Sequence, residues 1–524
     1  MGIRADDAGN NTHYVPCFRH NGQSYSPYDL PLRTHDEFID DAVAVESAPT
    51  NAEAERQAKE TGINGLPILA TLSSLEFPHS FGHDLMHLIP ENVIKNLLLH
   101  WIGEYKKLDE GDEEYELAPA VIEEIGRECV AAGDTTPAAF GARVPNIDTQ
   151  RFYFTAESYT LWTTLLAPVL LRNRFRQDKY YRHFRDLVEI FNDCLSMKIS
   201  REYIDVDLRD KIATWVFEYE RYYYQYEDSR LSACPLTIHA LLHIPDDILN
   251  GGPMWTYWNY VTERYVGFIV RSSKSRRNPY ASFARRLREI AQNSAIKVRY
   301  HLSRELDLSP KREEELKGHR VDGQRYSDIR VLYPRAVGPL STGVAKAINH
   351  YLQNTYRIPP AMAKALVPEE ATHWGRVSFL GGGDKMRGAD LTQQSGGYMT
   401  RDASFVKFSH LVDTNARNSR QPRVDERQVA YGQLLRLIEF SVDLPKECQV
   451  DHPLLLAVVR PVKPPKDNPY PFPVYQDGKF GSVEVVDADD VSCLVARVIA
   501  SRRGPRFYAL IERPDAMGAS PEEE

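Results

Sequence analysis

Cysteine is scarce in this sequence, and no two cysteines lie close together. The chain of 524 residues contains six, and none belongs to a Cys-x-x-Cys pair. Wide spacing indicates neither a disulfide framework nor a zinc ribbon and is typical of a reducing, intracellular compartment. The positions are Cys17, Cys129, Cys194, Cys234, Cys448 and Cys493.

Long hydrophobic runs are also missing. The longest, such as LLAPVLL at 165–171, are far too short to span a bilayer, and the N-terminal MGIRADDAGN lacks the apolar region of a signal peptide. A net charge of −9 excludes a polycation, so any contact with nucleic acid must come from a local basic patch. With 42% hydrophobic and 26% charged residues, the composition predicts a soluble, globular protein with no membrane partner.

The local signatures of several enzyme classes are absent as well. The glycine-rich GGGD at 381–384 lacks the Gly-Lys-Ser/Thr that grips a nucleotide, and it is typical of a flexible loop. There is no Gly-x-Ser-x-Gly elbow, and no cysteine has the local signature of a nucleophile. We therefore expect no small-molecule substrate.

The pattern of apolar residues divides the chain into segments. Residues 1–75 show no strong periodicity and are predicted to be irregular. A helix is predicted from Pro90 onward, because apolar residues recur at helical spacing and proline is tolerated at the first helical position. Those apolar residues are Ile94, Leu97, Leu98, Trp101, Ile102 and Tyr105. Residues 76–135 form the segment that contains this helix, and 136–305 read as a helical bundle rich in Leu, Tyr and Trp.

The carboxy-terminal part changes character. Residues 306–428 are predicted to be loop-rich, with a helix near 340–355. From 429 the period becomes two and β-branched residues gather, which predicts a small antiparallel β-barrel of about five strands over 429–515, followed by a tail at 516–524. The expected fold class is mainly α with a small carboxy-terminal β-barrel, α+β overall.

A polar cluster lies at the start of the helix expected from Pro90. Within 77–101 lie His79, His83, Asp84, His87 and Glu91. Carboxylates are hard oxygen ligands for Mg²⁺, and histidines four residues apart can face one metal ion. The same residue types also decorate ordinary helix starts, so a metal site, a catalytic site and a structural role all stay open.

A second histidine pair, His239 and His243 in HALLH, has the same spacing. Like His83 and His87, it lacks the intervening glutamate of a metalloprotease, and helix packing is the simpler interpretation.

A basic run lies between 271 and 288. It contains seven cations and no acid, with serines and a tyrosine between them, which suits a phosphate backbone. A solvated helical face is the alternative. The cations are Arg271, Lys274, Arg276, Arg277, Arg285, Arg286 and Arg288.

Several stretches together resemble a known family. SFGHDLMHLIPENVIKNLL at 80–98 resembles the D-x-M-H…E…N-V segment of CACTA (En/Spm-type) DDE transposases, in particular the fungal branch. The resemblance continues in order to about residue 290 and includes FTAESYTLW, YYRHFRDLVEI, the long stretch around HALLH, ERYVGF and SRRNP. YGQLLRLIEF and HPLLLAVVRP resemble the small β domain that ends fungal members.

The resemblance implies a transposase lineage acting on DNA in the nucleus. In that family an RNase H-like domain places three acids around two Mg²⁺ ions for phosphoryl transfer. The motif carries over onto Asp84, His87 and Glu91 as catalytic residues, with Asp84 and Glu91 as metal ligands. The segment 76–135 would then end the RNase H-like domain.

The family also places two aspartates and a Cys-x-x-Cys upstream of this motif, and the 83 residues before Asp84 contain no such cysteine pair. We therefore expect the carboxy-terminal part of a transposase, a non-autonomous chain that binds DNA without catalysing transposition. A homo-oligomer is a further candidate assembly. A protein-interaction or oligomerisation module without DNA binding is the alternative. An active Mg²⁺-dependent transposase, with the upstream acids supplied, is the second alternative.

Overall fold

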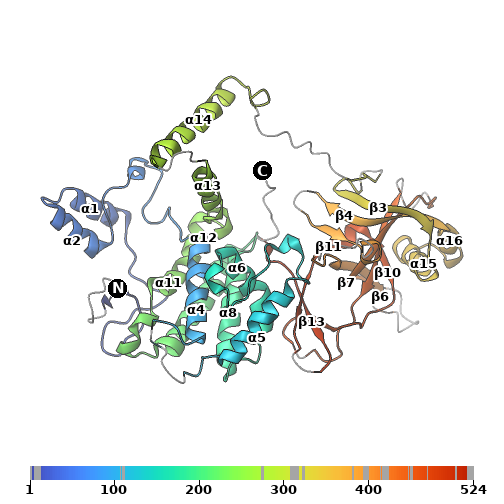
Figure 1. Cartoon of the computed structure of the whole chain (residues 1–524), viewed down its shortest axis with the longest axis horizontal. Helices are drawn as coiled ribbons and strands as arrows, with labels where there is room; N and C mark the ends of the chain where they lie inside the picture. Colours follow the sequence, from blue (N-terminus) through green and yellow to red (C-terminus); the bar gives the residue numbers. More distant parts are fainter. Residues whose placement is uncertain are drawn as a thin grey trace. The chain divides into compact units, whose positions relative to one another are not determined.

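The computed structural model describes most of the chain, and it divides into two compact units. The helical unit comprises Met1–Pro119 and Asn173–Asp307, and the β unit comprises Ala120–Arg172 and Leu308–Glu524 (Figure 1). The described residues are 3–4, 13–106, 108, 113–272, 277–306, 318–321, 325–380, 383–392, 401–413, 415, 424–445, 448, 453–468, 470–501 and 504–515.

The helical unit begins with two helices that the sequence did not predict. Helix α1 spans His35–Glu46 and α2 spans Asn51–Thr61. Each starts at a threonine whose side chain accepts a hydrogen bond from the backbone, and Thr34 forms a full capping box with Glu37. The prediction of an irregular segment over 1–75 was therefore wrong in this part. It failed because α2 buries no residue, so no apolar period marks it.

His87 and Glu91 of the polar cluster and the apolar residues that follow them lie in one continuous helical stretch, whereas His79 and His83 precede it. It consists of α3 (Leu85–Leu88), the π-helical η2 (Ile89–Ile94) and α4 (Lys95–Trp101). Asp84 is the N-cap, so the helix begins one and a half turns before Pro90, which lies within it. The expected apolar face is confirmed, because Ile94, Leu97 and Trp101 are fully buried.

The remaining helices of this unit follow the predicted bundle. Their core is aromatic: the Trp101 indole donates a hydrogen bond to the Tyr223 hydroxyl at 3.0 Å, and His183 stacks on Trp215 at 4.5 Å. Burial lowers the pKa of His183 to about 3, so the ring is neutral. The elements are α8 (Asp178–Cys194), α9 (Arg201–Tyr203), η6 (Ile204–Leu208), α10 (Arg209–Tyr219), η7 (Glu220–Tyr224), α11 (Leu236–Ala240), η9 (Leu241–His243), α12 (Ile244–Gly251), α13 (Tyr260–Arg271) and α14 (Pro279–Arg299).

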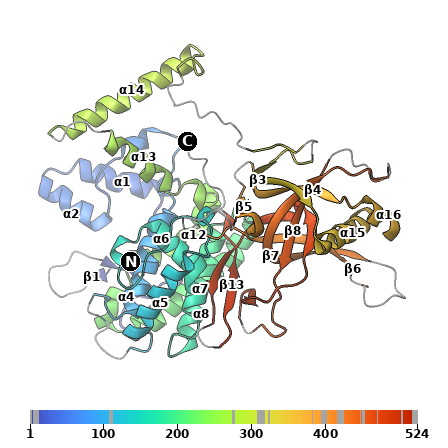
Figure 2. The ribbon, with the colours of Figure 1, turned by 45° about the vertical axis from the view of Figure 1, so that its right-hand side comes forward.

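The β unit is built on a curled antiparallel sheet of eight strands (Figure 2). The main order is β10-β8-β7-β4-β3, with β5 paired to β4, β6 to β7 and β11 to β6, and a separate sheet has the order β12-β13-β9. Helix α15 (Thr342–Tyr356) packs on the sheet through Ile348 and Leu352, which contact a core that includes Ile438, Leu456 and Val458. The helix predicted near 340–355 is thus confirmed, and α+β describes the whole.

The strands are β3 (Ile329–Pro339), β4 (Glu370–Phe379), β5 (Lys385–Arg387), β6 (Phe405–Asp413), β7 (Asp425–Phe440), β8 (Leu454–Pro461), β9 (Val474–Gln476), β10 (Glu484–Asp487), β11 (Val491–Leu494), β12 (Ala496–Ile499) and β13 (Phe507–Ile511). The prediction of a loop-rich segment over 306–428 was therefore wrong, since β3, β4 and β6 lie in the same sheet as β7. The outer half of β3 is mostly exposed and contains Pro334 and Gly338, so its sequence shows no alternation.

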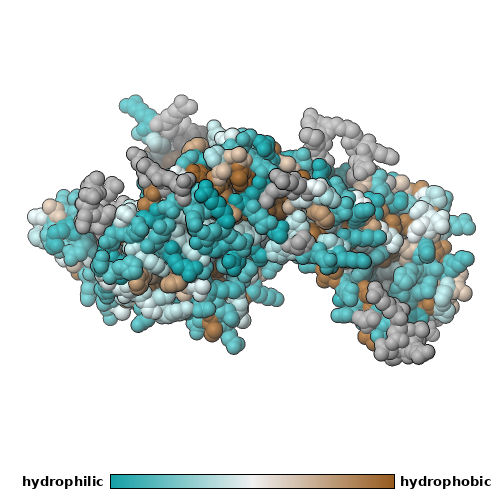
Figure 3. All heavy atoms as spheres, turned by 90° about the horizontal axis from the view of Figure 1, so that it is seen from below, coloured by the Kyte–Doolittle hydropathy of each residue, from teal (hydrophilic) through white to brown (hydrophobic). Residues whose placement is uncertain are grey.

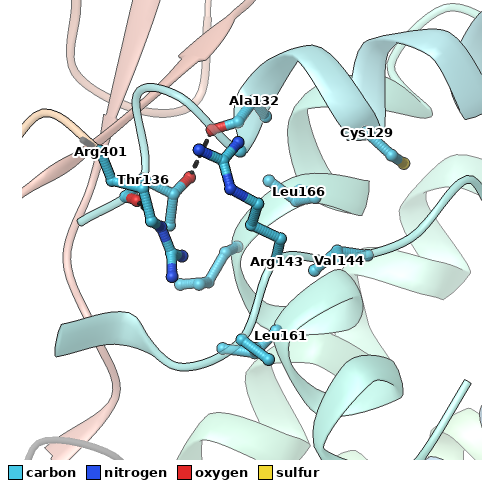
Figure 4. Close-up of a pocket in the computed structure, with 11 residues that line it drawn as sticks. Cys129, Ala132, Thr136, Arg143, Val144, Leu161, Leu166 and Arg401 are labelled. Carbon is cyan, nitrogen blue, oxygen red and sulfur yellow. Dashed lines mark hydrogen bonds between the residues drawn. The ribbon is translucent and has the colours of Figure 1, made fainter. Parts of the chain in front are cut away.

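The β unit also includes α5 (Pro119–Ala132), α6 (Ala156–Leu161), the π-helical η5 (Trp162–Leu166) and α7 (Ala167–Leu170). Arginines attach the loop after α5: Arg401 donates to the Thr136 and Gly141 carbonyls at 2.7 and 2.6 Å, and Arg513 donates to the Ala139 carbonyl at 2.5 Å. Arg401 and Arg143 line a cavity of about 10 Å³, room for roughly one water molecule. Figure 4 shows how the lining residues lie around it. The predicted boundary at 135/136 therefore falls within the β unit.

The face drawn in Figure 3 is largely hydrophilic, and hydrophobic side chains reach it in scattered patches. Within the described residues, no helix combines the length and the apolar character that a membrane span requires.

Candidate functional site

The predicted catalytic residues meet around one imidazole. The His87 Nδ1 lies 2.5 Å from Asp84 Oδ2, and its Nε2 lies 3.9 Å from Glu91 Oε2. Because the three residues are spaced by three and four positions in one helical stretch, their side chains lie on one side of it. The sequence motif therefore corresponds to a compact Asp–His–Glu group.

Asp84 has a structural role in this group. Its Oδ2 accepts the His87 backbone N–H at 3.0 Å, which caps α3, and its Oδ1 accepts the Asn259 backbone N–H at 2.7 Å. Both carboxylate oxygens are engaged, and the side chain is only 16% exposed. Asp84 thus connects the start of α3 to the turn that precedes α13.

The two histidine pairs come together in space. His83 Nδ1 lies 2.8 Å from Asp247 Oδ2, and the His83 ring stacks on the His243 ring with centroids 5.7 Å apart. His243 Nε2 in turn lies 3.2 Å from His239 Nε2. Sequence reasoning treated the pairs separately and missed Asp247, which follows HALLH in the chain.

Burial sets the protonation of this cluster. It lowers the pKa of His239 to about 4, with the neighbouring His243 adding to the effect, and it lowers the pKa of His243 in the same direction. The two rings are therefore neutral near pH 7, and one Nε2–H donates to the other Nε2. The His239 Nδ1 is buried without a hydrogen-bond partner.

The low pKa of His239 predicts that this histidine destabilises the folded chain at acidic pH. Because the pKa of His239 is about 4 in the folded chain and about 6.5 for an ordinary histidine, the unfolded chain binds more protons between these values. The contribution of His239 to stability is expected to fall as the pH drops from 6.5 toward 4, by at most about 1.4 kcal/mol per pH unit for one proton. Urea unfolding of wild type and His239→Gln, followed across this range, measures the difference in slope. Equal slopes would contradict the prediction.

The donor set does not fit the two Mg²⁺ ions that the resemblance implies. A two-metal centre needs several free carboxylates, but Asp84 is occupied by protein donors and Glu91 faces His87. In the described part of the chain, no group of three or more His, Cys, Asp or Glu side chains is arranged to hold a metal ion. We assign no metal-dependent step to Asp84, His87 and Glu91.

The basic run falls on two helices and their connection. Arg271 ends α13, Arg277 precedes α14, and Arg285, Arg286 and Arg288 lie on α14, all five exposed. Lys274 and Arg276 lie outside the described residues. Only Arg286 has an acidic neighbour among these five in the described structure, Glu289 at 3.9 Å, so this surface keeps its positive charge.

No protein-family model matches the chain, and neither the curated proteins nor the solved structures contain a match. The arrangement of α13, α14 and the Asp–His–Glu group therefore carries the functional conclusion.

Proposed function

We propose that this protein is a transposase-derived, nuclear DNA-binding protein that contacts duplex DNA through α14. The observation that carries the proposal is the exposed arginine group on that helix. Arg285 and Arg288 lie three residues apart and Arg299 eleven further on, so one side of the helix presents three guanidinium groups. Guanidinium groups donate paired hydrogen bonds to phosphate oxygens, which suits backbone contact without base reading.

We propose that the chain binds DNA without catalysing phosphoryl transfer. The resemblance implies phosphoryl transfer by acids around metal ions, but Asp84 serves as a helix cap and as an acceptor for Asn259. In the described helical unit the only paired strands are Ile3–Arg4 and His13–Tyr14, two residues each, and the segment predicted to end an RNase H-like domain is helical. Contact with DNA is thus the activity that we assign to this chain.

Salt dependence tests the proposal. Each lost phosphate contact is expected to reduce the slope of log K against log salt by about 0.9, so Arg285→Ala/Arg288→Ala should reduce it by about 2. At about 0.1 M salt, Kd should rise roughly ten- to fifty-fold. Fluorescence anisotropy with a labelled duplex of random sequence measures both quantities.

The matched control removes two exposed arginines from other helices, Arg127→Ala and Arg182→Ala, and should leave the slope unchanged. A wild-type slope near zero, or the same slope in both double variants, would refute DNA binding through α14.

A further inference from the structure

Helices α13 and α14 bury none of their side chains, although they carry many large apolar residues. The two helices have 12 and 21 residues. Helical propensity alone holds such elements only marginally, so an exposed apolar helix pair of this size calls for a covering partner. The exposed large apolar residues are Val261, Tyr265, Val266, Phe268, Val270, Tyr280, Leu287, Ile296 and Val298.

The apolar residues of α14 form a stripe on one side of the helix. Tyr280, Phe283, Leu287 and Ile290 recur at spacings of three and four residues, which places them on one face. Arg286 and Lys297 lie at the border of this stripe, whereas Arg285 and Arg288 lie on the other side of the helix. The apolar face and the face proposed for DNA are thus different surfaces.

The charge of the helix pair restricts what can cover the stripe. Helices α13 and α14 contain seven cations (Arg264, Arg271, Arg285, Arg286, Arg288, Lys297 and Arg299) and two acids (Glu263 and Glu289), a net charge of 7 − 2 = +5. Two such pairs placed face to face would repel each other. The covering surface must therefore be acidic and partly apolar.

The same chain carries a surface of that kind on α1 and α2. These helices contain eight acids (Asp36, Glu37, Asp40, Asp41, Glu46, Glu53, Glu55 and Glu60) and two cations (Arg56 and Lys59), a net charge of 2 − 8 = −6. On α1, Asp36, Asp40 and Val43 are exposed at i, i+4 and i+7, opposite the buried Val45. Just after α2, Ile68, Leu69 and Leu72 are exposed as well, Ile68 by 85%.

Within one copy of the chain the two surfaces leave each other uncovered. Among the described residues no ion pair joins α1 or α2 to α13 or α14; the arginines beside the acids are local ones, Arg33 with Asp41 and Arg56 with Glu53 and Glu60. Helix α1 is held in place by Phe38, which stacks on Phe77 with centroids 4.8 Å apart. The acidic surface is therefore fixed and exposed.

We propose that two copies of this chain associate reciprocally, the acidic α1–α2 surface of one copy covering the apolar stripe of α14 on the other. A two-fold arrangement forms the contact twice, because each copy contributes both surfaces. Asp36 and Asp40 then face Arg286 and Lys297, and Val43 faces Leu287. This self-association goes beyond DNA binding and leaves the side of Arg285 and Arg288 free.

Charge exchange in the full chain tests the proposal by light scattering coupled to size exclusion. Wild type should be a dimer that dissociates as salt rises, and Asp36→Lys/Asp40→Lys and Arg286→Glu/Lys297→Glu should each weaken it at least tenfold. The chain that carries all four substitutions should dimerise again, because both contacts then have opposite charges. A matched exchange at an exposed pair of the β unit, Glu123→Lys/Arg127→Glu, should leave the dimer intact.

The proposal would be overturned if wild type were monomeric, or if neither charge reversal weakened the dimer. It would also be overturned if the chain with all four substitutions stayed monomeric while its circular dichroism showed that the helices were folded. Its failure is distinguishable from failure of DNA binding. Asp36→Lys/Asp40→Lys should lose the dimer while keeping the DNA affinity of wild type, whereas Arg285→Ala/Arg288→Ala should do the reverse.

Discussion

Replacing Asp384 with alanine is expected to destabilise the β unit by about 3–5 kcal/mol. The Asp384 carboxylate pairs with Arg513, and the two side chains are only 4% and 10% exposed. Asp384 also accepts the Leu494 backbone N–H at 2.7 Å, so its loss leaves a buried guanidinium and a buried amide without their acceptor. Hydrogen exchange in β8, whose first six residues are buried, reports the free energy of opening of this unit alone.

Two variants separate the ion pair from general effects. Glu123→Ala breaks a pair whose side chains are both 62% exposed and should cost less than about 1 kcal/mol. Asp384→Leu/Arg513→Met removes both buried charges and should restore much of the stability, because no unpaired charge remains. If Asp384→Ala costs no more than Glu123→Ala, the pair is not buried as described.

The contribution of Glu220 to the stability of the helical unit is expected to fall by about 3 kcal/mol as the pH rises from 4.5 to about 7, opposite in sign to the contribution of His239. Burial raises the pKa of Glu220 from 4.5 to about 7, although its carboxylate accepts the backbone N–H groups of Cys17 and Phe18 at 2.6 and 3.1 Å. The folded chain therefore binds more protons than the unfolded chain between pH 4.5 and about 7. The stabilising contribution is complete below pH 4.5 and is lost as the pH rises through 7.

The cysteine and tyrosine groups that interact with Glu220 have pKa values above this range, so the difference between Glu220→Gln and wild type belongs to the Glu220 carboxyl group. Burial raises the pKa of Cys17 and of Tyr224 to about 12, and it raises the pKa of Cys234 and of Tyr226 as well.

As the pH rises from 4.5 to about 7, Glu220→Gln should gain about 3 kcal/mol on wild type in chemical unfolding, because the contributions of the histidines are common to both proteins. Glu202→Gln, an exposed substitution in α9, should retain the wild-type slope. The interpretation fails if Glu220→Gln keeps that slope too.

The helices that pack tightly were predictable, and those that do not were missed. The apolar period of α8 and α10 identifies them because one side of each is buried, from Phe184 to Trp215. Helix α2 depends instead on the Thr50 cap and on Arg56, which pairs with Glu53 and Glu60. Such local interactions leave no hydrophobic period in the sequence.

Only those contacts of the candidate site that join residues close together in the sequence could be predicted. Asp84, His87 and Glu91 share one helical stretch, so their spacing already placed them together. The contact of His83 with Asp247 joins positions 164 residues apart, and tertiary packing alone creates it. The same holds for the strands at 329–339 and 370–379, whose place in the sheet depends on β7, far along the chain.

The order of the two units along the chain restricts how recombination could transfer the β unit to another gene. Residues 120–172 belong to the β unit but are encoded between the two halves of the helical unit. A single recombination breakpoint therefore cannot transfer the β unit to another gene as a cassette: a junction near residue 308 would separate Arg401 and Arg513 from the carbonyls of Thr136, Gly141 and Ala139 that they bind. An exchange that keeps these contacts must carry residues 136–513 together, and these include part of the helical unit.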